Sequence, residues 1–260
     1  MAVYAYCLLR LAPNESWPVL DGIGGHPVFP FRCGKYSMLL SRLGPNFCFA
    51  PRSIVEHGQV IARAFETHTV LPMRFGTFFQ SEKQIEQLIR ENQRELLETF
   101  CRLRGKAEMH LKLCFGAIES DEPIPASPLS PKKQPQKTRS LRGSGPFNGE
   151  GEAEDLRSRE MAGQLAAWLR EMFHPLADQV SCRRLDSSEL VVDCAHLIES
   201  QRVESYRELC GLASEQVKDC ALRMSGPWPP YHFLPASVRL PAISLRPLKM
   251  ARTRSFAAAR

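Results

Sequence analysis

The chain has 260 residues, 43% of them apolar, which is enough for one large domain or two smaller ones with a buried core. No apolar run approaches the ~20 residues that a membrane-spanning helix needs, and the N-terminus alternates like a strand instead of resembling a signal peptide. The formal charge of +6 arises in two segments, Ser130–Gly145 and Ser237–Arg260, which hold basic residues and no acidic one. The sequence therefore indicates a cytoplasmic protein. It also argues against a nucleic-acid-binding function, because such a function usually requires a basic stripe on a folded surface.

Nine cysteines and seven histidines are scattered along the chain, without any Cys-x-x-Cys pair. A zinc site would need paired ligands at short spacing, so we predict no metal site and no cofactor. In a reducing compartment we expect the cysteines to be free thiols that act as small core residues.

The sequence pattern predicts a mixture of helices and strands in the first half of the chain. Val3–Leu9 alternates and is rich in strand formers, and the irregular segment 14–34 contains a short strand at Val28–Phe31. Tyr36–Leu43 is a further predicted strand, and Pro51 opens a helix that reaches about Thr67.

One long helix is predicted from Ser81 to Gly105, because Ser81 and Gln84 have capping-box spacing and glycine suits the terminating position. Residues 107–115 then alternate apolar and polar side chains, as in a strand with one buried face. On this pattern His110 should point to solvent.

The second half resumes after a segment rich in proline, serine and basic residues. We predict the order helix, strand, strand, helix, strand, at residues 161–173, 180–185, 190–195, 199–212 and 216–224. This is the order of a ferredoxin-like unit without its first strand. The predicted fold class is therefore α+β with two domains, the second a modified ferredoxin-like α/β sandwich. The predicted bounds are an N-terminal domain at 1–120, a disordered linker at 121–155, a C-terminal domain at 156–235 and a basic tail at 236–260.

Two short segments stand out, Val70–Phe79 and Ser225–Phe233. The second places three prolines around Trp228, and proline fixes φ and donates no backbone hydrogen bond. We therefore expect it to lie outside helices and sheets and to hold Trp228 and Tyr231 at fixed angles. It is either a rigid terminator whose aromatic rings fill a core or a preformed aromatic contact surface.

Arg74 lies two residues after Pro72 and two before Gly76. A guanidinium held there pairs with a buried carboxylate or caps carbonyls left unpaired by the break in regular structure, or else it contacts a partner directly. We favour the internal role, because the planar fork of arginine suits fixed pairing.

Few features indicate catalysis. Asp193 and Cys194 lie in a predicted buried strand, but no activating helix N-terminus or third orienting group accompanies the thiol. A buried structural cysteine is the simpler interpretation, so we predict no catalytic residue and no enzyme.

The two segments also carry a resemblance. The sequences Leu71-Pro72-Met73-Arg74-Phe75-Gly76-Thr77 and Gly226-Pro227-Trp228-Pro229-Pro230-Tyr231 are similar to motifs of the gas vesicle accessory proteins of the F/L family, with Met73 in place of the usual phenylalanine. A departure lies at Asp193-Cys194-Ala195-His196-Leu197, where relatives tend to have Asn-Ala-Ala-Tyr-Leu.

The resemblance implies two α+β domains and a non-catalytic accessory role at the gas vesicle, which supports buoyancy. The implied partners are the small hydrophobic shell protein and other accessory proteins, bound during assembly. The expected structural or interaction framework consists of Pro72, Arg74, Phe75, Gly76, Gly226, Pro227, Trp228, Pro229, Pro230 and Tyr231.

Two other functions stay open at this stage. A cytosolic enzyme on a ferredoxin-like scaffold would require a cleft lined by clustered acidic, histidine or cysteine side chains. A weak nucleic-acid binder would use the basic linker and tail, and its affinity would depend on salt.

Overall fold

The computed structural model describes residues 3–44, 47–115, 149–184, 190–217 and 220–235. They divide into two compact units, the first formed by residues 3–106 and 229–235 and the second by residues 107–228. The predicted basic tail and most of the predicted linker lie outside the described residues.

The first unit is built on a five-stranded sheet. Its strands are β1 (Val3–Leu9), β2 (Phe29–Cys33), β3 (Tyr36–Ser41), β4 (Val70–Pro72) and β5 (Phe78–Phe79). The order is β2-β3-β1-β4, with β5 also paired to β1, and every pairing is antiparallel. All seven residues of β1 are buried, as expected for the central strand of a covered sheet.

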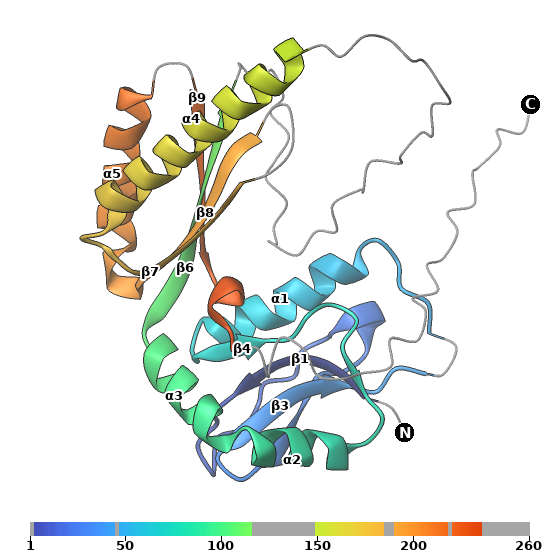
Figure 1. The fold of residues 1–260 in the computed structure, drawn as a ribbon. Helices are drawn as coiled ribbons and strands as arrows, with labels where there is room; N and C mark the ends of the chain where they lie inside the picture. The colour runs from blue at the N-terminus through green and yellow to red at the C-terminus, as the bar shows by residue number, and fades with distance from the viewer. Residues whose placement is uncertain (1–2, 45–46, 116–148, 185–189, 218–219, 236–260) are drawn as a thin grey trace, which may run out of the picture. The chain divides into compact units, whose positions relative to one another are not determined.

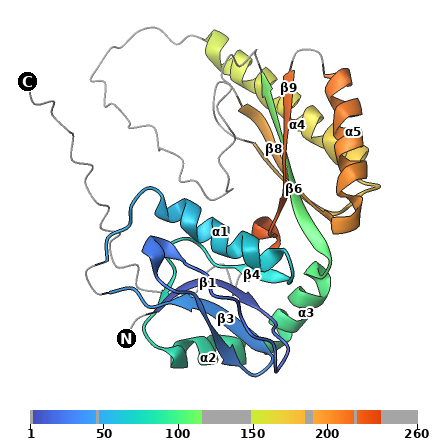
Figure 2. The same ribbon diagram turned by 180° about the vertical axis from the view of Figure 1, so that it is seen from behind.

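Helices cover both faces of this sheet (Figures 1 and 2). Helix α1 (Ser53–Phe65) lies on one face, and helices α2 (Glu82–Glu91) and α3 (Gln93–Leu103) lie on the other. Tyr36 of β3 packs against Phe100 of α3, with ring centroids 5.5 Å apart. Apart from the predicted helix over residues 81–105, the predicted elements of the first half are confirmed to within a few residues at each end.

The predicted single helix over residues 81–105 is wrong, because it is interrupted at Asn92. The side-chain amide of Asn92 donates to the carbonyl of Leu88 at 2.8 Å, and its backbone N–H donates to the same oxygen. Asparagine competes in this way with the regular helical pattern. The predicted end at Gly105 is confirmed, since Gly105 has φ of 69° directly after the helix.

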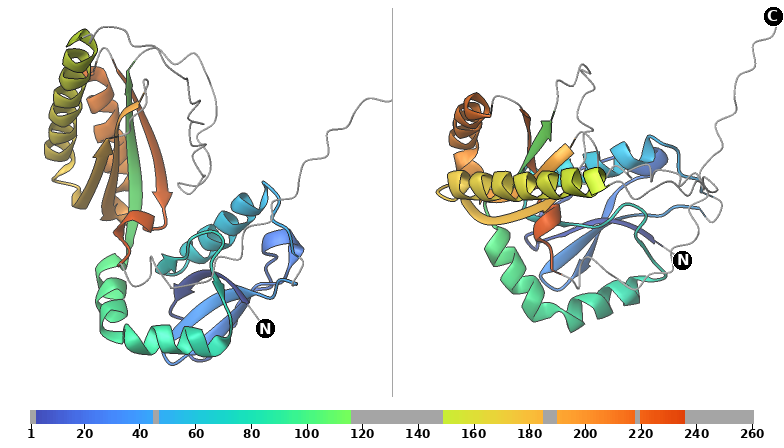
Figure 3. Two further views of the ribbon diagram at one scale, coloured as in Figure 1. Left: turned by 45° about the vertical axis from the view of Figure 1, so that its right-hand side comes forward. Right: turned by 45° about the horizontal axis from the view of Figure 1, so that its top comes forward.

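The second unit has a four-stranded sheet in the order β7-β8-β6-β9. Its elements follow one another as β6 (Lys106–Phe115), α4 (Gly149–Phe173), β7 (Ala177–Arg184), β8 (Leu190–Glu199), α5 (Val203–Gln216) and β9 (Cys220–Trp228). Both helices pack on the same face of the sheet (Figure 3), over a core that includes Met109, Leu169 and Tyr206.

This order is βαββαβ, the complete ferredoxin-like sequence of elements. The expected absence of a first strand is therefore wrong: β6 supplies it, although we had expected residues 107–115 to lie in an N-terminal domain ending at 120. Sequence periodicity identifies a strand but does not say which sheet it joins, since β6 pairs with β9 between residues as distant in sequence as Glu108 and Trp228.

Two further expectations need correction. Helix α4 begins at Gly149, inside the predicted linker. Cys182 and Cys194 form a disulfide, so these two are not free thiols. Among the described residues, no helix combines the length and the apolar character that crossing a bilayer would need.

Candidate interaction site

The segment that follows β4 forms a turn at Met73–Thr77, tied to β1 on both sides. The backbone N–H of Met73 donates to the carbonyl of Tyr6 at 2.8 Å, and the N–H of Ala5 donates to the carbonyl of Thr77 at 3.0 Å. Within the turn, the N–H and the hydroxyl of Thr77 both donate to the carbonyl of Arg74, at 3.1 and 2.7 Å. Gly76 has φ of 85°, which only glycine adopts readily.

A buried tyrosine–histidine pair also forms hydrogen bonds to the backbone of this turn. His57 of α1 lies 3.0 Å through Nε2 from the carbonyl oxygen of Met73 and 2.8 Å through Nδ1 from the hydroxyl of Tyr4. A carbonyl can only accept, so Nε2 carries the proton, Nδ1 accepts from Tyr4, and the Tyr4 oxygen accepts from the N–H of Gly76 at 3.2 Å. The directions of all three hydrogen bonds are thus mutually consistent.

Burial fixes the charge state of this pair. It lowers the pKa of His57 to about 4, against the smaller opposing effect of the hydrogen bond to Met73. Burial likewise raises the pKa of Tyr4 well above its ordinary value. Both groups are therefore neutral at physiological pH, and the network is structural.

Arg74 lies at the tip of this turn and is exposed. The part of the chain that the structure describes gives its guanidinium no ion pair and no hydrogen bond. Our preferred expectation, pairing with a buried carboxylate or with unpaired carbonyls, is therefore wrong. The carbonyls of the turn are instead satisfied by backbone N–H groups, the Thr77 hydroxyl and His57.

The other members of the first motif are buried or half-buried. Pro72 and Gly76 are buried, and Phe75 is half-buried with its ring centroid 5.0 Å from that of Phe49 and 5.7 Å from that of His57. These contacts anchor the turn around the exposed arginine.

The second motif is divided between the two units. Gly226, Pro227 and Trp228 form the end of β9, whereas Pro229, Pro230 and Tyr231 belong with the first unit. The expectation that this stretch avoids a sheet is therefore wrong for its first half. A proline is tolerated there because β9 is an edge strand and the ladder shifts register opposite Met109, between Glu108 and His110.

Trp228 and Tyr231 consequently have different surroundings. Trp228 is half-buried, and its indole N–H donates to the Ser225 hydroxyl at 3.2 Å. Tyr231 packs against the core of the first unit, and the carbonyl of nearby Phe233 accepts from the guanidinium of Arg102 at 2.6 Å. The two aromatic residues therefore do not share one environment.

A second buried polar group lies in the second unit, and it contradicts the prediction for His110. His110 is only 3% exposed. Its Nε2 lies 2.6 Å from the carboxylate of Glu108, and its Nδ1 lies 3.4 Å from the carboxylate of Asp193 on β8. Burial alone lowers the pKa of His110, but the hydrogen bonds and charges of Asp193 and Glu108 outweigh it and raise that pKa. Both ring nitrogens face carboxylates, so the group forms a buried ionic contact.

Sequence reasoning missed Tyr4 and His57 as determinants of the first motif. A weak signal existed for His57, since it lies on α1 at helical spacing with the buried residues Ser53, Val60 and Ile61. Nothing in the spacing of Tyr4 indicates a contact with a residue 53 positions away.

Comparisons with known proteins agree with this architecture. A family model described as gas vesicle synthesis protein GvpL/GvpF matches residues 2–235. A gas vesicle protein F of Streptomyces sp. (strain CB03234) is 24% identical over 245 residues, covering 90% of this chain and 100% of the relative. Another, from Microcystis aeruginosa (strain PCC 7806), is 31% identical over 105 residues, covering 39% and 43%.

Solved structures show the same fold. The crystal structure of GvpF from Anabaena sp. PCC7120 has a TM-score of 0.68 at 18% identity, covering 89% of this chain and 97% of that one. The crystal structure of GvpF from Microcystis aeruginosa has a TM-score of 0.66 at 22% identity, covering 89% and 98%.

Proposed function

The chain belongs to the gas vesicle synthesis protein family GvpL/GvpF, and from this premise we propose that it binds the shell protein and other accessory subunits during gas vesicle assembly without catalysing a reaction. A gas vesicle accessory role follows from membership of the family. The observation that carries the proposal is the match of the family model to residues 2–235, nearly the whole chain.

A binding role suits the chemistry of the expected partner. A small shell subunit with an exposed apolar surface aggregates unless another protein covers it or delivers it to a growing edge. A non-catalytic binder needs a firm contact surface more than it needs convergent titratable groups. The enzyme alternative gains no specific support, since Glu108, His110 and Asp193 are each at most 4% exposed, and both carboxylates lie within hydrogen-bond distance of His110.

We place the contact of the first unit at the turn Met73–Thr77. Its backbone is fixed by β1 and by the Tyr4–His57 pair, so little conformational entropy is lost when a partner binds. Arg74 is exposed there, and arginine is enriched among the residues that dominate binding energy. Its guanidinium suits a carboxylate or backbone carbonyls on the partner.

The first test replaces Arg74. We expect Arg74→Ala to weaken co-purification with the shell protein and accessory subunits by about tenfold, the loss typical of a contact residue, while the unfolding transition stays unchanged. Arg94→Ala is the matched control, because Arg94 is a highly exposed arginine of the same unit, on α3. Equal binding by wild type and Arg74→Ala would remove this surface from the proposal.

The second test concerns Trp228. We expect Trp228→Ala to reduce the same co-purification while the protein stays folded, because the indole is only half-buried. Ser225→Ala serves as the control, since it removes only the hydrogen-bond partner of the indole N–H. If Trp228→Ala unfolds the second unit, as measured by circular dichroism and hydrogen exchange, Trp228 is a core residue and not part of the contact surface.

A further inference from the structure

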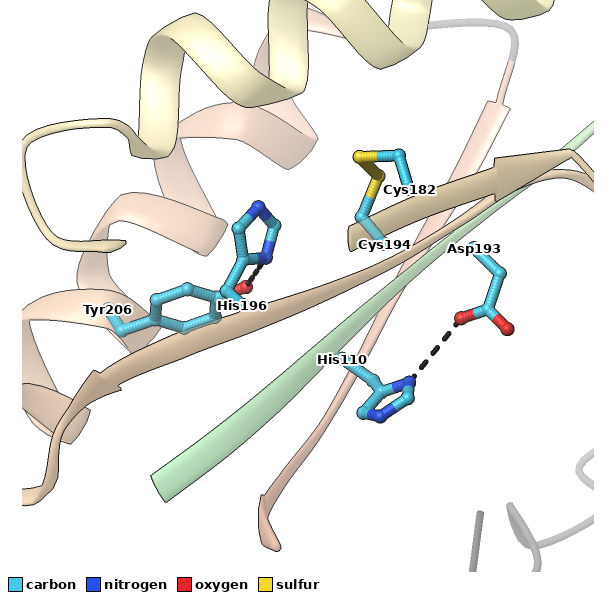
Figure 4. The surroundings of a disulfide bond; sticks show 6 residues. All are labelled: His110, Cys182, Asp193, Cys194, His196 and Tyr206. Carbon is cyan, nitrogen blue, oxygen red and sulfur yellow. Dashed lines mark hydrogen bonds and ion pairs between the residues drawn. A yellow bond between two sulfur atoms is a disulfide. The ribbon is translucent and has the colours of Figure 1, made fainter. Parts of the chain in front are cut away.

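Cys182 and Cys194 are the one pair that the described residues join by a disulfide (Figure 4). They lie directly opposite each other on the antiparallel strands β7 and β8, with Cα atoms 4.1 Å apart. Other cysteines of the chain, such as Cys7, Cys33, Cys101 and Cys210, have free thiols. The pairing therefore reflects a specific register and not a general tendency of this cysteine-rich chain to form disulfides.

We propose that Cys182 and Cys194 form a reversible thiol–disulfide switch that controls how firmly β7 is held at the edge of the second sheet. The oxidant is a low-molecular-weight disulfide, and the reductant is a low-molecular-weight thiol or a dithiol protein. This inference does not depend on the proposed binding function.

The two cysteines differ in access, and this sets the order of the steps. Cys182 is partly exposed on the edge strand, whereas Cys194 is fully buried against the helices. The Cys182 thiol therefore loses its proton to solvent and attacks the small disulfide, which gives a mixed disulfide and releases one small thiolate. The Cys194 thiol then attacks the sulfur of Cys182, gives its proton to the first small thiolate, and releases the second small thiolate, which takes up a proton from solvent. Two protein thiols are oxidised and one small disulfide is reduced to two thiols, so atoms and electrons balance.

Strand β7 is the element that such a bond would affect most. It is the terminal strand of the order β7-β8-β6-β9, so β8 is its only neighbour among the strands that the structure describes. Several of its side chains, including Asp178, Gln179 and Ser181, are exposed. An edge strand with few buried contacts opens locally at low free-energy cost, and a covalent bond across the pair opposes that opening.

Strand β8, by contrast, is anchored on both of its faces, as Figure 4 shows. On one face Asp193 meets His110 of β6 at 3.4 Å. On the other, His196 lies 2.7 Å through Nδ1 from the hydroxyl of Tyr206 on α5. Because β8 is fixed independently of the disulfide, reduction should loosen β7 alone.

The experiment treats the purified full-length protein with oxidised or reduced glutathione and maps disulfides by alkylation and peptide mass spectrometry. After oxidised glutathione we expect one intramolecular Cys182–Cys194 bond, which reduced glutathione or a dithiol opens again. Hydrogen exchange of the β7 amides should be slower by about tenfold or more in the oxidised form, with α5 unchanged.

Matched variants separate the switch from general cysteine chemistry. Cys182→Ser should abolish both the bond and the change in β7 exchange, whereas Cys210→Ser, at a cysteine of the same core with a free thiol, should preserve both. Alkylation of both Cys182 and Cys194 after oxidised glutathione, or a bond that leaves β7 exchange unaltered, would overturn the proposal. The mapping uses the wild-type protein, so it decides the question even if a variant fails to fold.

Discussion

In the described part of each unit a tyrosine–histidine pair is buried, and the two pairs have nearly the same contact. The hydroxyl of Tyr4 lies 2.8 Å from Nδ1 of His57 in the first unit, and that of Tyr206 lies 2.7 Å from Nδ1 of His196 in the second. Their second ring nitrogens differ. Nε2 of His57 donates to the carbonyl of Met73, whereas Nε2 of His196 is buried and has no hydrogen-bond partner among the described residues.

The difference shows that the same two side chains can serve unlike purposes. In the first unit the pair joins β1, α1 and the turn that presents Arg74, so it fixes a backbone shape. In the second unit the pair joins only β8 to α5, beside the ring of Phe173, which stacks on His196 with centroids 5.3 Å apart. A buried nitrogen without a partner costs free energy, so this second pair should contribute less to stability.

The largest expected effect concerns the glycines of the two motifs. A Cβ at Gly226 would lie 2.9 Å from the backbone oxygen of Glu108 and 2.7 Å from Sδ of Met109, and φ there is 127°. We expect Gly226→Ala to destabilise the protein by about 4 kcal/mol, through both clash and backbone strain. Gly76→Ala should cost about 2 kcal/mol, the strain of a positive φ. Urea denaturation followed by circular dichroism measures both, and equal losses would contradict this ranking.

The next effect tests the two tyrosines directly. Tyr4→Phe leaves two buried groups without partners, Nδ1 of His57 and the N–H of Gly76, so we expect a loss of about 3 kcal/mol. Tyr206→Phe leaves only Nδ1 of His196, so about 1 kcal/mol is expected. The same denaturation measurement applies, with hydrogen exchange of α1 and α5 to assign each loss to its unit. A larger loss from Tyr206→Phe would reverse our view of the two pairs.

The smallest effect at neutral pH comes from the buried histidines, whose contributions to stability depend on pH. Burial lowers the pKa of His196 to about 4, with a further contribution from the charge of His110, and burial lowers that of His57 to about 4 as well. Because the unfolded chain takes up these protons nearer pH 6.5, the stability that each neutral imidazole confers is complete above pH 6.5 and is lost as the pH falls towards 4. His110, with its raised pKa, acts in the opposite sense: its contribution is complete below pH 6.5 and is lost as the pH rises through the raised value.

His196→Tyr isolates the contribution of one histidine, because tyrosine keeps an aromatic ring at this position but takes up no proton in this pH range. Stability at pH 7 should change by less than about 1 kcal/mol, and the loss between pH 7 and 4.5 should shrink by about 2 kcal/mol. Urea midpoints at the two pH values give both numbers, and His68→Tyr, at a partly exposed histidine of the first unit, is the control. An unchanged acid loss in His196→Tyr would mean that His196 is not neutral and buried in the folded protein.

Much of the fold could be predicted because its elements have local signals. The periodicity of α1, the alternation of β1 and the terminating Gly105 all depend on neighbours within a few residues. The exposure of Arg74 and the burial of His110 could not be predicted, since each depends on residues distant in sequence. His110, for example, meets Asp193 at a separation of 83 positions.

The sequence by itself determined the α+β class, most elements and, through its two proline-containing motifs, the family. Only the tertiary structure decided that β6 joins the second sheet, that the Gly226–Tyr231 motif is divided between the units, and that Cys182 meets Cys194. The physical reason is that propensity and periodicity act within one helix or strand, whereas strand order, register and buried contacts are set by packing between distant segments.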